Sequence, residues 1–241
     1  MTDAMPFLIC LILPSAAVLG GGTLVRLWQP GAGTLTAIQH FTAGLVLGAV
    51  AVELCPELVN SPYFASAVVG FVLGSGFMLV IGQVTKAAEP PTGQTGSGMG
   101  LLFAVAVDLL VDGLLVGTAI TVGGKQGILI AIALTIEAFF LSLSTCETLR
   151  GRKAGFRKIF LTVLILAALV AAGVLAGDFF SSQLGGGPRT ATLAFATAAL
   201  LYLVMEELIV EAHQRQDRPM TPVLFFAGFL LIFILQHVLG G

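Results

Sequence analysis

Charged residues are scarce in this sequence. Only 10% of the 241 residues are charged, whereas 57% are hydrophobic and the mean hydropathy is +1.02. A soluble domain carries roughly 25% charged residues, so this chain cannot cover a water-facing surface. The ten-residue alternating segments of a membrane β-barrel are also missing, because the apolar runs are unbroken. We therefore predict an all-α, multi-pass protein of the plasma or inner membrane.

The sequence also lacks an excess of basic residues and closely spaced pairs of cysteines. The formal net charge is −2, which argues against nucleic acid as a partner. Cys10, Cys55 and Cys146 are far apart, form no CxxC pair and lie in or beside apolar runs. We interpret them as buried free thiols and not as metal ligands.

Eight apolar runs dominate what is present. Each is close to the ~20 residues that a helix needs to cross a hydrocarbon layer about 30 Å thick. Short loops separate them, so we expect one bundle forming a single transmembrane domain over 1–241. The longest loop, 86–99, is rich in Gly, Pro, Ser and Thr and is predicted to be a flexible cytoplasmic linker. The runs cover residues 7–27, 36–57, 64–85, 100–121, 126–147, 158–178, 190–212 and 220–238.

The basic residues predict an orientation. With the N-terminus outside, only Lys125 and Arg189 of the 11 Lys and Arg residues fall outside, and the rest fall in cytoplasmic loops. This positive-inside bias places both termini outside. The basic cluster at 150–158 contributes strongly to the bias, and its alternative role is to bind anionic lipid.

Glycines recur at four-residue spacing in three of the runs. Such pairs let helices approach closely, so we interpret them as packing surfaces of the bundle. The pairs are Gly44 with Gly48, Gly70 with Gly74, and Gly113 with Gly117.

An internal repeat relates the second and seventh runs. Both end in the pattern E-L-x-x-E, at 53–57 and at 207–211. Because the second run travels outward and the seventh inward, the two acidic pairs lie at opposite membrane faces. We predict a 3+2+3 inverted repeat, in which helices one to three mirror helices six to eight. The alternative for Glu57 and Glu211 is that they are helix-end acids in headgroup water.

Three acids lie near the middle of the fourth and fifth runs. Asp108 and Asp112 are one helical turn apart, and Glu137 lies at the centre of the next, antiparallel run. We expect the three to meet at the membrane midplane. Neither run has Lys or Arg in its interior, and an ionised carboxylate in hydrocarbon is costly, so a cation is the expected partner. The alternative is a neutral set, protonated or hydrogen-bonded to Thr135, Gln83 or backbone.

These central runs resemble those of the ZIP family of divalent-metal transporters (zinc/iron permeases). The stretch before Gly113 is similar to the family's fourth-helix motif H-N-x-P-E-G, with Asp108 at the His position and Asp112 at the Glu position. Glu137 falls on a metal-binding Glu of the fifth helix. The resemblance implies a central metal site formed by Asp108, Asp112 and Glu137.

The resemblance extends to the second and seventh helices. Segments 39–44 and 53–57 are similar to the second helix of the family, and 202–213 is similar to the seventh. It implies that Glu53 and Glu57 line an outer entrance, and that a cytoplasmic exit is lined by His40, Glu206, Glu207, Glu211 and His213. His40 has the alternative interpretation of a hydrogen-bonded packing residue.

The chain departs from the family pattern at the metal site. Asp108 replaces His, Leu109 replaces Asn, and Ala133 replaces His or Gln. Val111 and Ile136 replace the two helix-breaking prolines. The remaining site is all-oxygen, so Zn²⁺ is disfavoured and harder ions such as Mn²⁺, Mg²⁺ or Ca²⁺ are favoured, with Fe²⁺ and Cd²⁺ as further options.

The three central acids and the family resemblance leave four functions to compare. The favoured one is a carrier or slow channel, not an enzyme, that moves a divalent cation inward by alternating exposure of the midplane site. The second is a ZIP-like carrier whose acids bind protons or another cationic solute. A metalloenzyme is disfavoured because the central runs contain no His, and a scaffold would not need three central acids. The expected partners are the ion, as cargo and not as a cofactor, and the lipid bilayer; a homodimer is left open.

Overall fold

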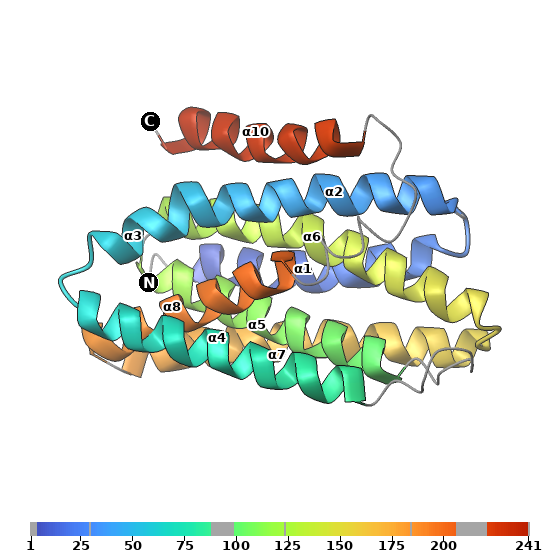
Figure 1. Ribbon diagram of the computed structural model, residues 1–241, viewed down its shortest axis with the longest axis horizontal. Helices are drawn as coiled ribbons and strands as arrows, with labels where there is room; N and C mark the ends of the chain where they lie inside the picture. The colour runs from blue at the N-terminus through green and yellow to red at the C-terminus, as the bar shows by residue number, and fades with distance from the viewer. Residues whose placement is uncertain are drawn as a thin grey trace.

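The regular elements of the structure, a computed structural model, are all helical among the residues that it describes. These are 4–28, 30–87, 99–122, 124–183, 185–205 and 221–240. The helices are α1 (Ala4–Leu24), α2 (Ala32–Ala49), the π-helix η1 (Val50–Leu54), α3 (Cys55–Val59), α4 (Phe64–Ala87), α5 (Met99–Val122), α6 (Gly124–Gly151), α7 (Phe156–Gln183), α8 (Gly186–Leu203) and α10 (Thr221–Gly240) (Figure 1).

Six helical segments are long and apolar enough to cross a membrane. They are α1, the continuous segment α2–η1–α3, α4, α5, α6 and α7, and α10 adds a shorter apolar stretch at Pro222–Val238. The prediction of a multi-pass helical membrane bundle is confirmed at this level. Helical segments of the described chain overlap each of the eight predicted runs, the seventh only over its first part.

The helix ends differ from the predicted runs by a few residues, most at the C-terminal end of α7. α7 continues to Gln183, past the expected end at 178, because the first glycine-rich break comes only at 185–187. Of the predicted linker 86–99, the first two residues complete α4 and Met99 begins α5, while 88–98 lie outside the described residues. The second half of the seventh run, 206–212, also lies outside them.

The helices lie along the long axis of the molecule and alternate in direction (Figure 1). α1 begins and α10 ends at the same end of the bundle, on the left in Figure 1. The most extensive helix contacts are those of α5 with α7, α2 with α10, α4 with α8 and α1 with α6.

Glycines allow these helix pairs to pack closely. A Cβ atom on Gly113 of α5 would overlap the carbonyl oxygen of Val170 in α7, and one on Gly44 of α2 would overlap that of Phe225 in α10. Gly74 of α4 meets the α8 backbone in the same way. Only glycine fits such close backbone approaches, so the interpretation of the glycine pairs as packing surfaces is confirmed.

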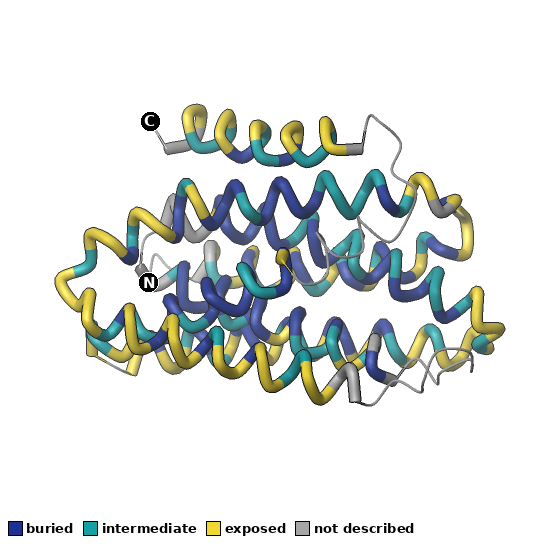
Figure 2. Tube along the Cα trace, in the orientation of Figure 1, coloured by how far each residue is buried: buried dark blue, intermediate teal, exposed yellow. Residues whose placement is uncertain are grey.

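The buried core lies between α2, α5, α6 and α8 (Figure 2). Of the residues in the apolar span of α5, 61% are buried within the molecule, whereas only 22% of those in the apolar span of α4 are buried. The outer helices therefore present apolar side chains to their surroundings, as contact with hydrocarbon requires. On α4 these exposed side chains are Phe64, Val68, Val69, Phe71, Val72, Leu73, Phe77, Leu79, Val80 and Val84.

Candidate metal centre

The three central acids meet in the core. Asp108 and Asp112 project from α5 and Glu137 projects from α6, and one carboxylate oxygen from each lies within 4.8 Å of the other two. Their exposed fractions are 3%, 2% and 9%. The expected meeting of these side chains is therefore observed, while their binding of a metal stays a prediction.

Helix geometry accounts for the cluster. Asp108 and Asp112 are four residues apart on one uninterrupted α-helix, which places them on the same face. α6 packs against α5 in the opposite direction (Figure 1). Its Glu137 meets the two aspartates of α5. Leu109 and Val111, between the two aspartates, and Ala133, one turn before Glu137, are buried and apolar. The three acids thus form a polar cluster surrounded by apolar side chains.

α5 and α6 pass the acid cluster without a break. Val111 and Ile136 stand where the ZIP motifs have helix-breaking prolines, and both helices remain α-helical across these positions. Backbone carbonyls within an α-helix are used by its own hydrogen bonds. The cluster therefore offers an ion side-chain carboxylates and no unwound backbone.

Asp112 has an unsatisfied carboxylate. Neither of its oxygens accepts a hydrogen bond from any described residue. The Thr135 hydroxyl donates to the Ala131 carbonyl oxygen of its own helix, and Gln83 is exposed at the end of α4. For Asp112 the structure describes no hydrogen bond from Thr135, Gln83 or the backbone, so a cation or a proton is left as its partner. For Asp108 and Glu137 the neutral, hydrogen-bonded alternative stays a prediction.

The dimensions of the cluster suit a hard cation. Two oxygens bound to one Ca²⁺ at about 2.4 Å lie up to about 4.8 Å apart, and those bound to Mg²⁺ lie somewhat closer. The carboxylate oxygens here fall within that limit. Three ionised carboxylates around one divalent ion leave one negative charge, which a proton or a second cation would balance.

Glu53 is a further buried acid, with an exposed fraction of 4%. Neither of its carboxylate oxygens accepts a hydrogen bond from the described chain. Glu53 lies in η1, which the sequence analysis did not predict. The signal was Pro56, whose missing N–H removes a helical hydrogen bond just after Glu53. Such π-turns within α-helices are frequent at functional sites.

The other predicted pathway residues divide into two groups. His40 is half-buried, and its Nδ1 lies 2.9 Å from the Thr36 carbonyl oxygen, which supports the packing interpretation. Glu57 is half-buried, one helical turn beyond Glu53. Outside the described residues lie Glu206, Glu207, Glu211 and His213, so their roles stay predictions.

The interpretation of the cysteines as buried thiols is partly wrong. Cys10 and Cys146 are buried, but Cys55 is exposed. Cys55 is the first residue of α3, directly after the π-helix, and it lines a shallow apolar groove together with Phe64 and Phe71. All three thiols are free.

Comparison with known proteins adds no family assignment. No protein-family model matches the chain, and no curated protein matches it. The ZIP resemblance therefore rests on the sequence motifs described above.

Proposed function

We propose that this protein is a membrane carrier for a divalent cation, with Asp108, Asp112 and Glu137 as its central site. The observation that carries the proposal is the Asp112 carboxylate, which is buried beside two other acids and accepts no hydrogen bond from the described chain. Ionisable groups inside membrane helices are costly, and they mark ion and substrate pathways. A bound divalent cation would neutralise most of the charge of this cluster.

A repeat in the helix ends supports a transport mechanism. A π-turn begins at Val50 in the second run, and another begins at Val204 in the seventh. The spacing from Glu53 to Glu207, the first acids of the two E-L-x-x-E patterns, equals the spacing from Val50 to Val204. The two π-turns thus begin at positions that correspond in the two runs, three residues before the first Glu of each E-L-x-x-E pattern in the sequence.

The packing between helices repeats at the same spacing. A Cβ atom on Gly228 would overlap the carbonyl oxygen of Phe41, and one on Gly74 would overlap that of Phe195. The spacing from Phe41 to Phe195, and from Gly74 to Gly228, equals that from Glu53 to Glu207. At this pair of positions, the contact of α2 with α10 thus corresponds to the contact of α8 with α4.

The helix pairs and their directions support a 3+2+3 inverted repeat. The packing of α1 on α6 corresponds to that of α7 on α5. α1 and α7 run in opposite directions, as do α2 and α8, and α4 and α10 (Figure 1). Inverted repeats let a carrier expose one central site to either membrane face by rocking one part against another. This is the mechanism that we propose here.

The acidic helix ends and the basic residues suggest a route and a direction. Glu53, buried and without a hydrogen-bond partner in the described chain, would receive the ion at the outer entrance. The end of the bundle with Arg26 and the basic segment 150–158 would face the cytoplasm of a plasma or inner membrane. Both termini would then lie outside, and transport would be directed inward.

The donor set suggests which ions are carried. Among the described His, Cys, Asp and Glu side chains, only carboxylates form the cluster, and the sequences of α5 and α6 contain no His. Mn²⁺, Mg²⁺ and Ca²⁺ suit such ligands better than Zn²⁺, which prefers imidazole and thiolate. The charge of the cluster favours one second candidate, a carrier of the same fold whose acids bind protons or another cationic solute.

Uptake into proteoliposomes tests the proposal. We expect wild-type protein to transport Mn²⁺ into vesicles that contain a metal-sensitive dye, and Asp112→Asn to abolish this transport. The matched control is Asp178→Asn, which removes a carboxylate of α7 that is outside the acid cluster. Equal uptake by wild type and Asp112→Asn would exclude the central acids from the mechanism. Proton flux without metal would favour the second candidate.

A further inference from the structure

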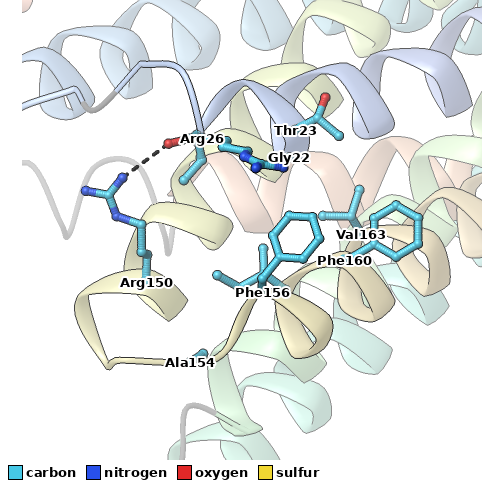
Figure 3. Close-up of a pocket in the computed structure, with 10 residues that line it drawn as sticks. Gly22, Thr23, Arg26, Arg150, Ala154, Phe156, Phe160 and Val163 are labelled. Carbon is cyan, nitrogen blue, oxygen red and sulfur yellow. Dashed lines mark hydrogen bonds between the residues drawn. The ribbon is translucent and has the colours of Figure 1, made fainter.

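A pocket of about 320 Å³ lies at the end of the bundle where α1 and α6 end and α7 begins (Figure 3). Its wall is mainly apolar, but two arginines reach it from segments far apart in the sequence. The pocket is lined by, among others, Arg26, Arg150, Ala154, Phe156, Phe160 and Val163.

The apolar wall of the pocket is formed by the first turns of α7. The rings of Phe156 and Phe160 stack with centroids 6.2 Å apart, and Val163 continues the same surface one turn further along (Figure 3). The exposed fractions of the two rings are 64% and 49%. The span from Phe156 to Val163 covers about 10 Å of helix, which is enough to hold the upper part of an acyl chain.

The polar edge of the pocket carries positive charge. The Arg26 guanidinium lies over the Phe156 ring, with its Cζ atom 5.3 Å from the ring centroid. Arg150 Nη1 donates to the Val25 carbonyl oxygen at 3.2 Å, and its Nε lies 3.8 Å from Glu147 (Figure 3). Within the described chain, Arg26 has no carboxylate partner. Its charge is therefore available to an external anion.

The loop between α6 and α7 increases this positive charge. Segment 150–158 contains five basic residues and no acid. Lys153 has a φ of 58°, a left-handed conformation that usually belongs to glycine at the end of a helix. The Lys153 and Ala154 amides donate to carbonyl oxygens of the last turn of α6, so this conformation closes the helix. The chain thus has a basic side chain where the backbone favours glycine.

We propose that this pocket binds one anionic phospholipid. The lipid phosphate would contact Arg26 and the basic side chains of segment 150–158, while an acyl chain would lie along Phe156, Phe160 and Val163. Charge complementarity and the apolar wall on the outside of a membrane bundle select this occupant. Clusters of basic residues at the ends of membrane helices attract anionic headgroups in the same way.

The only tryptophan of the chain offers a direct readout. Trp28 lies two residues after Arg26 and is exposed. Lipids with brominated acyl chains quench tryptophan fluorescence on contact, so quenching reports which lipid occupies the surroundings of Trp28. In mixed bilayers of equal composition, we expect brominated phosphatidylglycerol to quench wild-type Trp28 more strongly than brominated phosphatidylcholine. Dissolved inorganic phosphate should not reduce this difference.

Three variants separate the pocket from general charge attraction. Arg26→Gln should reduce the preference for the anionic lipid about fivefold, the usual effect of one basic side chain near an anionic surface. Lys125→Gln is the matched control, because Lys125 lies at the opposite end of α6 from Arg150, and it should leave the preference unchanged. Ala154→Leu fills the pocket without changing any charge, and it should also reduce the preference.

Two results would overturn the proposal. Equal quenching of the wild type by the two brominated lipids would show that no anionic lipid is selected at this site. An unchanged preference in both Arg26→Gln and Ala154→Leu would show that the lipid is attracted by the membrane-facing charge in general and not by the pocket. Neither result depends on whether the protein transports metal.

Discussion

Asp112 of α5 and Glu137 of α6 place carboxylate oxygens within 4.8 Å of each other in a part of the core that excludes solvent. When both are ionised, the two carboxylates repel at this separation, and neither oxygen of Asp112 is offset by a hydrogen bond from the described chain. A protein that holds such a pair tolerates an unfavourable interaction that an added cation would relieve. The first two predictions test this relationship.

Asp112→Asn should stabilise the metal-free protein and abolish its response to metal. The amide keeps the shape of the side chain but removes a buried charge, so the melting temperature without metal should rise. Added Mn²⁺ should raise the melting temperature of the wild type, because ligand binding to the folded state stabilises it, but not that of the variant. Thermal unfolding in detergent measures both effects. A lower melting temperature of metal-free Asp112→Asn would contradict the interpretation of this charge as unsatisfied.

Stabilisation by metal should weaken as the pH falls. Carboxylates must lose their protons to bind a metal, so acidification makes protons compete with the ion for Asp108, Asp112 and Glu137. The rise in melting temperature with saturating Mn²⁺ should therefore shrink between neutral and mildly acid solution, and a higher Mn²⁺ concentration should restore it. A stabilisation that does not change with pH would place the ion away from these acids.

Glu53→Gln should slow uptake without removing the central site. The variant neutralises a buried acid at the proposed entrance, while the carboxylates of the cluster remain. The uptake rate of Mn²⁺ should fall, and the Mn²⁺-induced rise in melting temperature should persist. Pro56→Ala should also slow uptake, because a restored N–H lets η1 relax towards an α-helix and turns Glu53 away. Loss of the thermal response in Glu53→Gln would instead make Glu53 part of the central site.

Gly113→Ala should destabilise the bundle, whereas Gly76→Ala should not. A methyl group at Gly113 would overlap the Val170 carbonyl oxygen, and overpacking of this kind costs about 1–3 kcal/mol. Nothing lies within 4 Å of a Cβ at Gly76, so alanine there gains up to about 1 kcal/mol of helix propensity. Unfolding of each variant in mixtures with an increasing fraction of denaturing detergent compares their free energies of unfolding. Equal stabilities would show that α5 and α7 can separate without cost.

Lys153→Gly should stabilise the end of α6. Glycine adopts the left-handed conformation without the clash of a Cβ atom, so the free energy of unfolding should rise by about 1 kcal/mol. The same unfolding measurement applies, with Lys158→Gly in the first turn of α7 as a control that should destabilise. If Lys153→Gly is no more stable than the wild type, the lysine makes a compensating contact.

The sequence predicts the centre of the molecule better than its periphery. The proximity of Asp108, Asp112 and Glu137 could be predicted from the sequence, because helical periodicity and the antiparallel packing of consecutive helices fix their relative positions. The exposure of Cys55 and the pocket at Arg26 could not be predicted, since both depend on contacts between segments that are distant in the chain. The π-helix at Glu53 is intermediate, because Pro56 disturbs the helix but does not determine how it adjusts.

α5 and α6 pass the acid cluster as intact helices, so no unwound backbone takes part in it. Each ligand can therefore be exchanged by a single codon change that leaves the surrounding architecture in place. Asp108→His would add an imidazole to the same helical face and shift the site towards softer metals. For the proposed carrier, the choice of ion would then be separable from the choice of fold, and the scaffold would be a starting point for engineering altered ion selectivity.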